Sequence, residues 1–160
     1  MVRKVFEGNL VDTKGSFAIL VSRWNDLITS RLLEGALDAL RRHGVDPQTR
    51  VDVIWAPGAY EVPLLASKIA ATGRYDAAIA LACVIRGGTP HFDFVANEIS
   101  KGLANISISS GLPISFGVLT TNTIDQAVER AGTKMGNKGS EAALAALEMV
   151  NLLRAIDGGE

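Results

Sequence analysis

The sequence contains a single cysteine, Cys83, among its 160 residues. One cysteine cannot form a disulfide within the chain, and a reduced compartment is therefore expected. Because Cys83 lies inside an apolar run, it is predicted to be a small buried hydrophobe rather than a nucleophile. No apolar run reaches the ~20 residues that a membrane-spanning helix needs, and the first residues lack the core of a signal peptide. We therefore expect a cytoplasmic protein with no membrane partner.

An excess of charge of either sign is also missing. The chain has 16 Lys and Arg against 17 Asp and Glu, which gives a formal net charge of -1. Without a basic stripe, nucleic-acid binding has no electrostatic support. The sequence shows no cluster of residues with metal-ligand spacing, so no metal site is predicted. Hydrophobic residues make up 48% of the chain, which predicts one domain over residues 1–160 with a full core.

Strand and helix patterns alternate along the whole chain. Four continuous apolar runs predict strands at residues 17–21, 51–55, 77–85 and 114–119. Helical spacing of apolar residues predicts helices between these runs and after the last one. Continuous rather than alternating apolar strands are typical of a parallel sheet that is covered on both faces. The predicted fold is α/β: a three-layer helix–sheet–helix sandwich around a four-stranded parallel sheet, of flavodoxin-like type.

Two segments fall outside this pattern. Residues 2–10 are short and partly apolar, and they are predicted to form either an edge strand or an arm laid on a neighbouring subunit. Residues 132–139 are rich in glycine and lysine and are predicted to form a loop.

The most informative stretch is RGGTPHF at residues 86–92, which follows the longest apolar run. Its two glycines can adopt positive φ and leave the backbone N–H groups open to a ligand. Thr89 is predicted to cap the next helix, and Pro90 suits its first position. A helix N-terminus offers unpaired N–H groups and partial positive charge, which suits phosphate. The same charge disfavours an imidazolium, so His91 is expected to be neutral and able to relay a proton.

Polar and aromatic residues follow every predicted strand. Since the carboxyl ends of parallel strands meet at one edge of a sheet, we expect these residues to gather there: Trp24 and Asn25; Ala59, Tyr60 and Glu61; Gly88, Thr89 and His91; Thr120, Thr121 and Asn122. An aromatic plane, a carboxylate, an anion site and a histidine would suit a flat polar heterocycle together with a phosphate. Taken singly, Arg130, Lys138 and Phe116 are better explained as helix-end charge, solvated loop charge and core.

Four motifs resemble the 6,7-dimethyl-8-ribityllumazine synthase family. They are GGTPHFD at 87–93, PGAYEVP at 57–63, ERAGTK at 129–134 and GNKG at 136–139, in the order and spacing of that family. The resemblance covers residues 6–153. It implies a transferase of riboflavin biosynthesis that condenses 5-amino-6-(D-ribitylamino)uracil with 3,4-dihydroxy-2-butanone 4-phosphate to 6,7-dimethyl-8-ribityllumazine. Phosphate and water are released, and no cofactor is required.

The resemblance also implies a role for residues in each of the turns. It implies stacking on the pyrimidine by Trp24, contacts with the ribityl chain from Ala59, Tyr60 and Glu61, backbone contacts with the pyrimidine edge from Cys83, Val84 and Ile85, phosphate binding by Gly88 and Thr89, and proton transfer by His91. Two positions depart from the common pattern of the family: Trp24 stands where Phe is usual, and Met135 stands where many relatives have His.

Three further residues are implied to act from an adjacent subunit. They are Phe116, Arg130, which would pair with the phosphate, and Lys138 close to it; this replaces the single-residue interpretations given above. The resemblance implies a homopentamer with active sites between subunits, and riboflavin synthase as a partner. Residues 136–139 carry no insertion before the last helix, which resembles relatives whose pentamers assemble into icosahedral capsids.

Two alternatives belong to other functional classes. The first is a flavin- or pyrimidine-binding shell protein whose catalysis has decayed, and the presence of both His91 and Arg130 argues against it. The second is a phosphoacceptor switch with flavodoxin-like topology. Such a switch needs clustered acidic residues after the first strand, where Asp26 stands alone.

Overall fold

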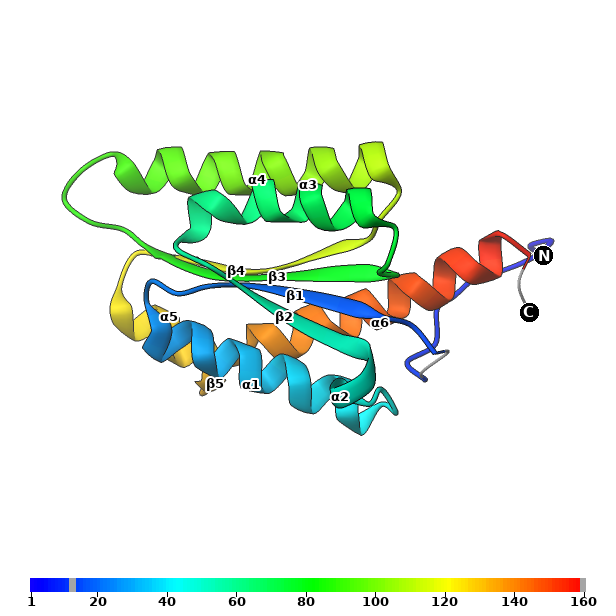
Figure 1. Ribbon diagram of the computed structural model, residues 1–160. Coiled ribbons are helices and arrows are strands. Elements are labelled where there is room, and N and C mark those ends of the chain that lie inside the picture. Colours follow the sequence, from blue (N-terminus) through cyan, green and yellow to red (C-terminus); the bar gives the residue numbers. More distant parts are fainter. Residues whose placement is uncertain (12–13, 159–160) are drawn as a thin grey trace.

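The computed structural model describes residues 1–11 and 14–158. Four strands form a parallel sheet in the order β2-β1-β3-β4, with helices on both faces (Figure 1). The strands are β1 (Phe17–Ser22), β2 (Val51–Ala56), β3 (Ala77–Ile85) and β4 (Ile114–Thr121). The predicted three-layer sandwich around a four-stranded parallel sheet is confirmed.

Two long helices cover one face of the sheet, and two more cover the other (Figure 1). The first pair is α3 (Val62–Thr72) and α4 (His91–Ser110). The second pair is α1 (Asp26–Arg42) and α6 (Lys138–Ile156). The short helix α5 (Ile124–Glu129) lies on the same face as the second pair. Two short helices, α2 (Pro47–Arg50) and η1 (Ala59–Glu61), flank β2. Within the described part of the chain, no helix has the length and apolar character required to cross a membrane.

The central strands β1 and β3 supply both halves of the core. Phe17, Ile19 and Leu81 belong to the cluster packed under α1 and α6. Leu20 and Ala80 belong to the cluster under α3 and α4. Because successive strand residues point to opposite faces, and both faces are covered, each position of β1 is buried. This double burial explains why these strands are continuous apolar runs in the sequence.

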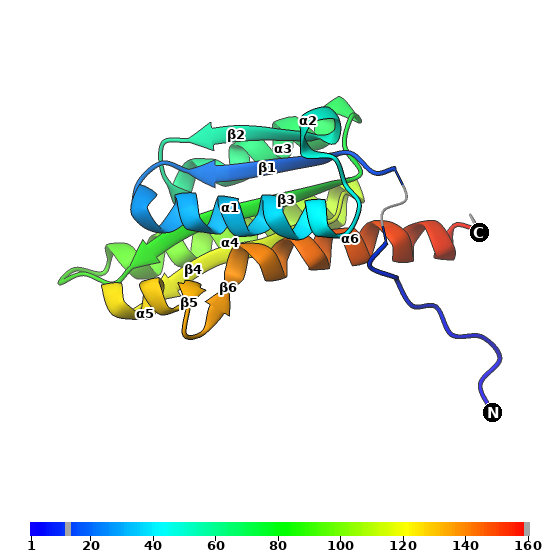
Figure 2. The ribbon, with the colours of Figure 1, turned by 90° about the horizontal axis from the view of Figure 1, so that it is seen from below.

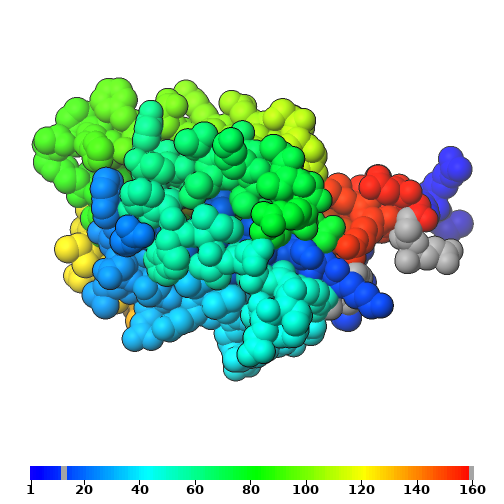
Figure 3. Space-filling model, in the orientation of Figure 1, coloured from blue at the N-terminus to red at the C-terminus, as the bar shows by residue number. Residues whose placement is uncertain are grey.

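The N-terminal residues 1–11 form an arm without a strand, so the edge-strand alternative is wrong within this chain. The arm leaves the body beside α6, at the end of the molecule where α6 projects (Figures 2 and 3). The Asn151 side chain of α6 donates to the Asn9 carbonyl oxygen at 2.8 Å. A Cβ at Gly8 would lie 2.2 Å from the Glu148 carbonyl oxygen. The base of the arm therefore packs on a helix backbone and not on a sheet edge.

The segment predicted as a loop, residues 132–139, forms a short hairpin instead. Its strands are β5 (Ala131–Thr133) and β6 (Gly136–Asn137). The last helix starts at Lys138, inside the segment predicted as a loop, because the Asn137 side-chain oxygen accepts the Gly139 N–H at 2.8 Å and caps the helix. Strands this short leave no apolar period in the sequence from which to detect them.

Candidate functional site

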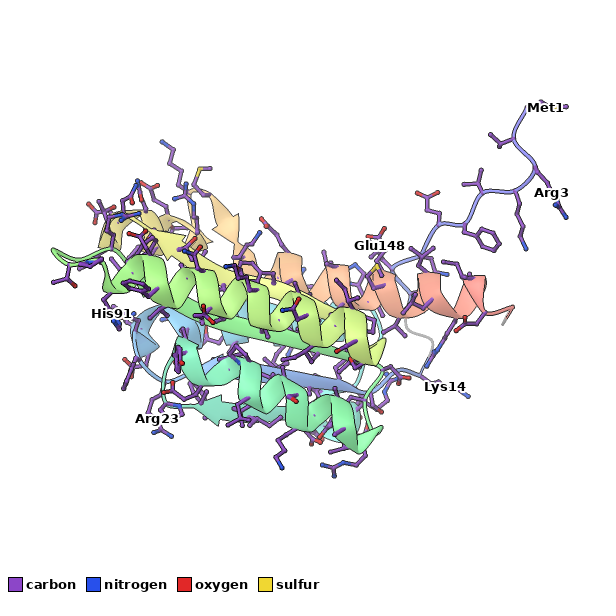
Figure 4. The ribbon with its side chains drawn as sticks, turned by 90° about the horizontal axis from the view of Figure 1, so that it is seen from above. Met1, Arg3, Lys14, Arg23, His91 and Glu148 are labelled. Carbon is purple, nitrogen blue, oxygen red and sulfur yellow. The ribbon has the colours of Figure 1, made fainter. Side chains whose placement is uncertain are left out.

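Backbone hydrogen bonds join the turns at the carboxyl edge of the sheet. In the turn after β1, Arg23 N–H donates to Ala56 O at 2.8 Å, and Trp24 N–H donates to Pro57 O at 3.1 Å. These two bonds fix that turn against the turn after β2. Arg23 and His91 lie at the same end of the molecule, opposite to Met1 (Figure 4).

Asn25 links the turn after β1 to the end of β3. Its side-chain Nδ2 donates to the Cys83 carbonyl oxygen at 2.9 Å. Its backbone has φ 64 and ψ 43, in the left-handed region, which asparagine tolerates better than most residues. The sequence indicates Asn25 only as a polar turn residue beside a helix start. Its bond to a strand carbonyl far along the chain has no signal in local pattern.

A cavity of about 160 Å³ lies where these turns meet. It is lined by Trp24, Asn25, Ala59, Tyr60, Cys83, Val84, Ile85, His91 and Val95. All of these except Val95 are among the residues predicted for this edge or its site, and the structure brings them together from four separate segments. Val95 lies four residues after His91 and so on the same face of α4, although its helical spacing alone indicates a core residue.

The glycine-rich turn differs from its prediction in two details. Helix α4 starts at His91 with Pro90 at the N-cap position, and no side chain forms a cap hydrogen bond. The predicted cap by Thr89 is wrong, because Thr89 lies one residue too early for its hydroxyl to reach the first N–H groups. Gly87 and Gly88 are not among the glycines with positive φ in the described chain. A Cβ at either would meet nothing within 4 Å, so the backbone there is open.

Arg86 braces this open turn. Its guanidinium lies 4.3 Å from the centroid of the Phe92 ring. It also donates to the Asn122 side-chain oxygen at 3.0 Å and pairs with Asp93 at 3.2 Å. A planar guanidinium that stacks and hydrogen-bonds at once holds one orientation better than a lysine would.

Glu61 and Tyr60 differ in how freely they face solvent. The Glu61 Oε2 atom accepts the Gly58 N–H at 3.1 Å, so this carboxylate closes its own turn. Tyr60 leaves 62% of its surface exposed beside the cavity. Glu61 therefore has a structural contact of its own in the isolated chain, and a polyhydroxyl ligand would have to share its oxygens.

Six of the predicted site residues do not line the His91 cavity. Glu61, Gly88 and Thr89 belong to the turns beside it, whereas Phe116, Arg130 and Lys138 lie on other elements. Arg130 and Lys138 line a different cavity of about 420 Å³, together with Met135. Phe116 belongs to the edge strand β4 and is 40% exposed; it lines neither cavity. Within one chain, the structure does not bring these three side chains to His91.

The Arg130 and Lys138 side chains, which line the larger cavity, contact neighbouring acceptors. Arg130 donates to the Gln126 carbonyl oxygen at 2.9 Å and lies 3.6 Å from the Glu129 carboxylate. Lys138 lies 3.5 Å from Glu141. The side chains of both ion pairs are at least 39% exposed, so the pairs are weak and both cations remain available to an anion.

A comparison with protein families identifies one family whose model spans the residues of both cavities. The family model described as 6,7-dimethyl-8-ribityllumazine synthase matches residues 14–154. The matched span contains the residues of both cavities and leaves out the arm at residues 1–11.

The thiol of Cys83 generates a testable prediction about reactivity. Burial raises its pKa from 9.0 to about 11, because desolvation disfavours the thiolate. Alkylation of the folded protein by iodoacetamide should therefore increase with pH toward about 11, whereas the urea-unfolded chain should level off near its ordinary value. Between pH 9.0 and about pH 11, the Cys83 thiol has lost its proton in the unfolded chain but keeps it in the folded chain. The free energy of unfolding therefore falls as pH rises through this range. Equal pH profiles for the two states would contradict the burial argument.

Proposed function

Because the chain belongs to the 6,7-dimethyl-8-ribityllumazine synthase family of transferases in riboflavin biosynthesis, we propose that it condenses 5-amino-6-(D-ribitylamino)uracil with 3,4-dihydroxy-2-butanone 4-phosphate. The product is 6,7-dimethyl-8-ribityllumazine, with release of phosphate and water. The observation that carries this proposal is the cavity in which Trp24 from one turn faces the same space as His91 from another. The product would serve riboflavin synthase, which we propose as a functional partner.

The pyrimidine binds between the first and third turns. Trp24 supplies an aromatic face, 65% exposed in the free chain, on which a flat ring can stack. The backbone of Cys83, Val84 and Ile85 offers hydrogen-bonding groups to the edge of that ring. The buried thiol stays protonated and takes no covalent part. Ala59, Tyr60 and Glu61 hold the ribityl chain.

The phosphate of the second substrate binds at Gly88 and Thr89. The backbone there is open, and the N-terminus of the long helix α4 lies next in the chain, so partial positive charge favours an anion. Since phosphate leaves during the reaction, a fixed site for its charge also stabilises the leaving group. Holding both substrates side by side at one edge of the sheet supplies the proximity that a two-substrate condensation needs.

His91 moves the protons. The amine of the pyrimidine attacks the ketone, and protons must pass between the amine, the carbinol and the enol as water and phosphate depart. One imidazole beside the reacting carbons can accept and return a proton at each step. His91 occupies the first turn of α4 and lines the cavity, and it follows Gly88 and Thr89 closely in the chain.

An adjacent copy of the chain completes the site with Phe116, Arg130 and Lys138. Two groups of exposed apolar side chains support an assembly of identical copies. One group lies near the His91 cavity and includes Trp24, Leu27, Tyr60 and Leu64; the other lies along β4, α5 and the hairpin and includes Phe116, Ile124, Val128 and Met135. Contact between unlike surfaces of identical copies generates a ring where the rotation between copies closes, and we propose that it closes as a homopentamer.

The arm at residues 1–11 extends this assembly. Val2, Val5 and Phe6 are exposed on it, and β2 is an edge strand that exposes Val53 and Trp55. An unpaired edge and a free extended segment can complete each other between copies. The arm of one copy would lie on the next.

The tight hairpin before α6 generates a prediction about particle size. Residues 136–139 lead into α6 without an insertion, as in relatives that form capsids. In mass photometry we expect icosahedral particles many times heavier than a pentamer. A mass distribution with pentamers as the largest species would contradict the capsid and leave the pentamer in place.

The role of His91 is tested by His91→Ala. Turnover should fall by about 10²- to 10⁴-fold, while pyrimidine affinity stays largely intact, because the ring moves protons and does not hold the heterocycle. The readout is the fluorescence of the lumazine formed when both substrates are mixed. His43→Ala is the matched control, since His43 is the other histidine of the chain and contacts the Ala39 carbonyl oxygen at the end of α1. Unchanged turnover in His91→Ala would reject the assigned role.

The origin of Arg130 is tested by mixing two defective chains. His91→Ala and Arg130→Ala should each be nearly inactive. In randomly mixed rings, about one quarter of the sites would combine an intact His91 from one copy with an intact Arg130 from its neighbour. Mixing His91→Ala with the double variant His91→Ala/Arg130→Ala should restore nothing. Activity that never recovers in the first mixture would place both residues in the same copy.

A further inference from the structure

Position 58 requires glycine for a steric reason and not because of its backbone conformation. Its φ of -144 and ψ of -179 are extended values open to any residue. A Cβ at this position, however, would lie 2.5 Å from Cε3 and 2.7 Å from Cζ3 of the Trp24 indole. The ring therefore rests directly on the backbone of the turn after β2.

We propose that Gly58 is a positioning residue, whose missing side chain sets how deep the Trp24 indole lies against the wall of the His91 cavity. The inference rests on the proposed function, in which that indole stacks on the pyrimidine. Gly58 needs no contact with substrate for this role, because it acts through the ring.

The backbone beneath the indole cannot retreat to make room. Trp24 N–H donates to Pro57 O at 3.1 Å, so the residue before Gly58 is tied to the ring's own main chain. Asn25, the residue after Trp24, donates its side-chain N–H to the Cys83 carbonyl oxygen. A methyl group at position 58 must therefore be accommodated by rotation of the indole, which is the exposed partner.

The required displacement is large on the scale of a binding site. Carbon atoms in contact lie ~3.5 Å apart or more, so the ring has to move by about 1 Å from the 2.5 Å position. Misplacement of that size can weaken a reaction by up to about 100-fold. Gly87, in the turn after β3, has nothing within 4 Å of a built Cβ, so the constraint at Gly58 is not shared by every glycine of this edge.

The experiment is a double-mutant cycle of Gly58→Ala and Trp24→Ala, with KM for the pyrimidine substrate and kcat measured separately. Gly58→Ala alone should raise KM by about tenfold or more and change kcat less, because a displaced stacking surface affects binding before it affects proton transfer. In the Trp24→Ala background, the same glycine change should alter KM by less than about twofold. Equal losses in both backgrounds would overturn the proposal and assign the effect to the turn itself, through the Glu61 bond to Gly58 N–H.

A readout that needs no turnover separates this inference from the proposed function. In a Trp55→Phe background, Trp24 is the remaining tryptophan, and acrylamide quenching of its fluorescence should change when Gly58→Ala is added. Unchanged quenching would refute the displacement. Should Trp24→Ala leave KM unaltered, the stacking role fails, while the quenching result still decides the displacement. If Gly58→Ala does not fold, the double variant should, since it removes the clash; failure of both would also overturn the proposal.

Discussion

The site depends on one hydrogen bond from a side chain to a strand: the Asn25 carboxamide donates to the Cys83 carbonyl oxygen at 2.9 Å. β1 and β3 are neighbours in the sheet, but the backbone hydrogen bonds of the turn after β1 tie it only to the end of β2 and the turn that follows. The Asn25 bond adds the tie to β3. It holds the turn that carries Trp24 against the strand that leads to His91, and the left-handed backbone of Asn25 aims its side chain across the gap. A non-polar residue here would lose both the bond and the tolerance for that backbone.

The rigid core makes this hydrogen bond effective in positioning the site. All positions of β1 and nearly all of β3 are buried on both faces, so the strand ends are fixed in space and the turns inherit that precision. The face under α3 and α4 is lined by alanines of β3, and small side chains let those helices approach closely. The start of α4, with His91, is thereby set at a defined height above the sheet edge.

The elements that the sequence predicts well are those with a long apolar signal. The bounds predicted for β3, residues 77–85, coincide with the structure, because a run of consecutive buried positions leaves little ambiguity. The hairpin at residues 131–137 escapes prediction, since its strands are too short to carry a period. The predicted cap at Thr89 is wrong by one residue. The close approach of the Trp24 indole to Gly58 has no sequence signature, because it joins two turns that are distant in the chain. The grouping of the predicted residues at one cavity follows from parallel topology; the roles of individual side chains do not.

The separation of Arg130 and Lys138 from His91 has an electrostatic consequence. In the isolated chain both cations rest on exposed carboxylates, Arg130 on Glu129 at 3.6 Å and Lys138 on Glu141 at 3.5 Å. Exposed pairs of this kind contribute only ~0–1 kcal/mol, so little is lost when a cation turns to a better partner. In the proposed site, a phosphate at Gly88 and Thr89 of a neighbouring copy would carry more charge than either carboxylate and would accept bidentate bonds from the guanidinium. The local carboxylates thus pair with both cations in the free chain without competing strongly with the anion.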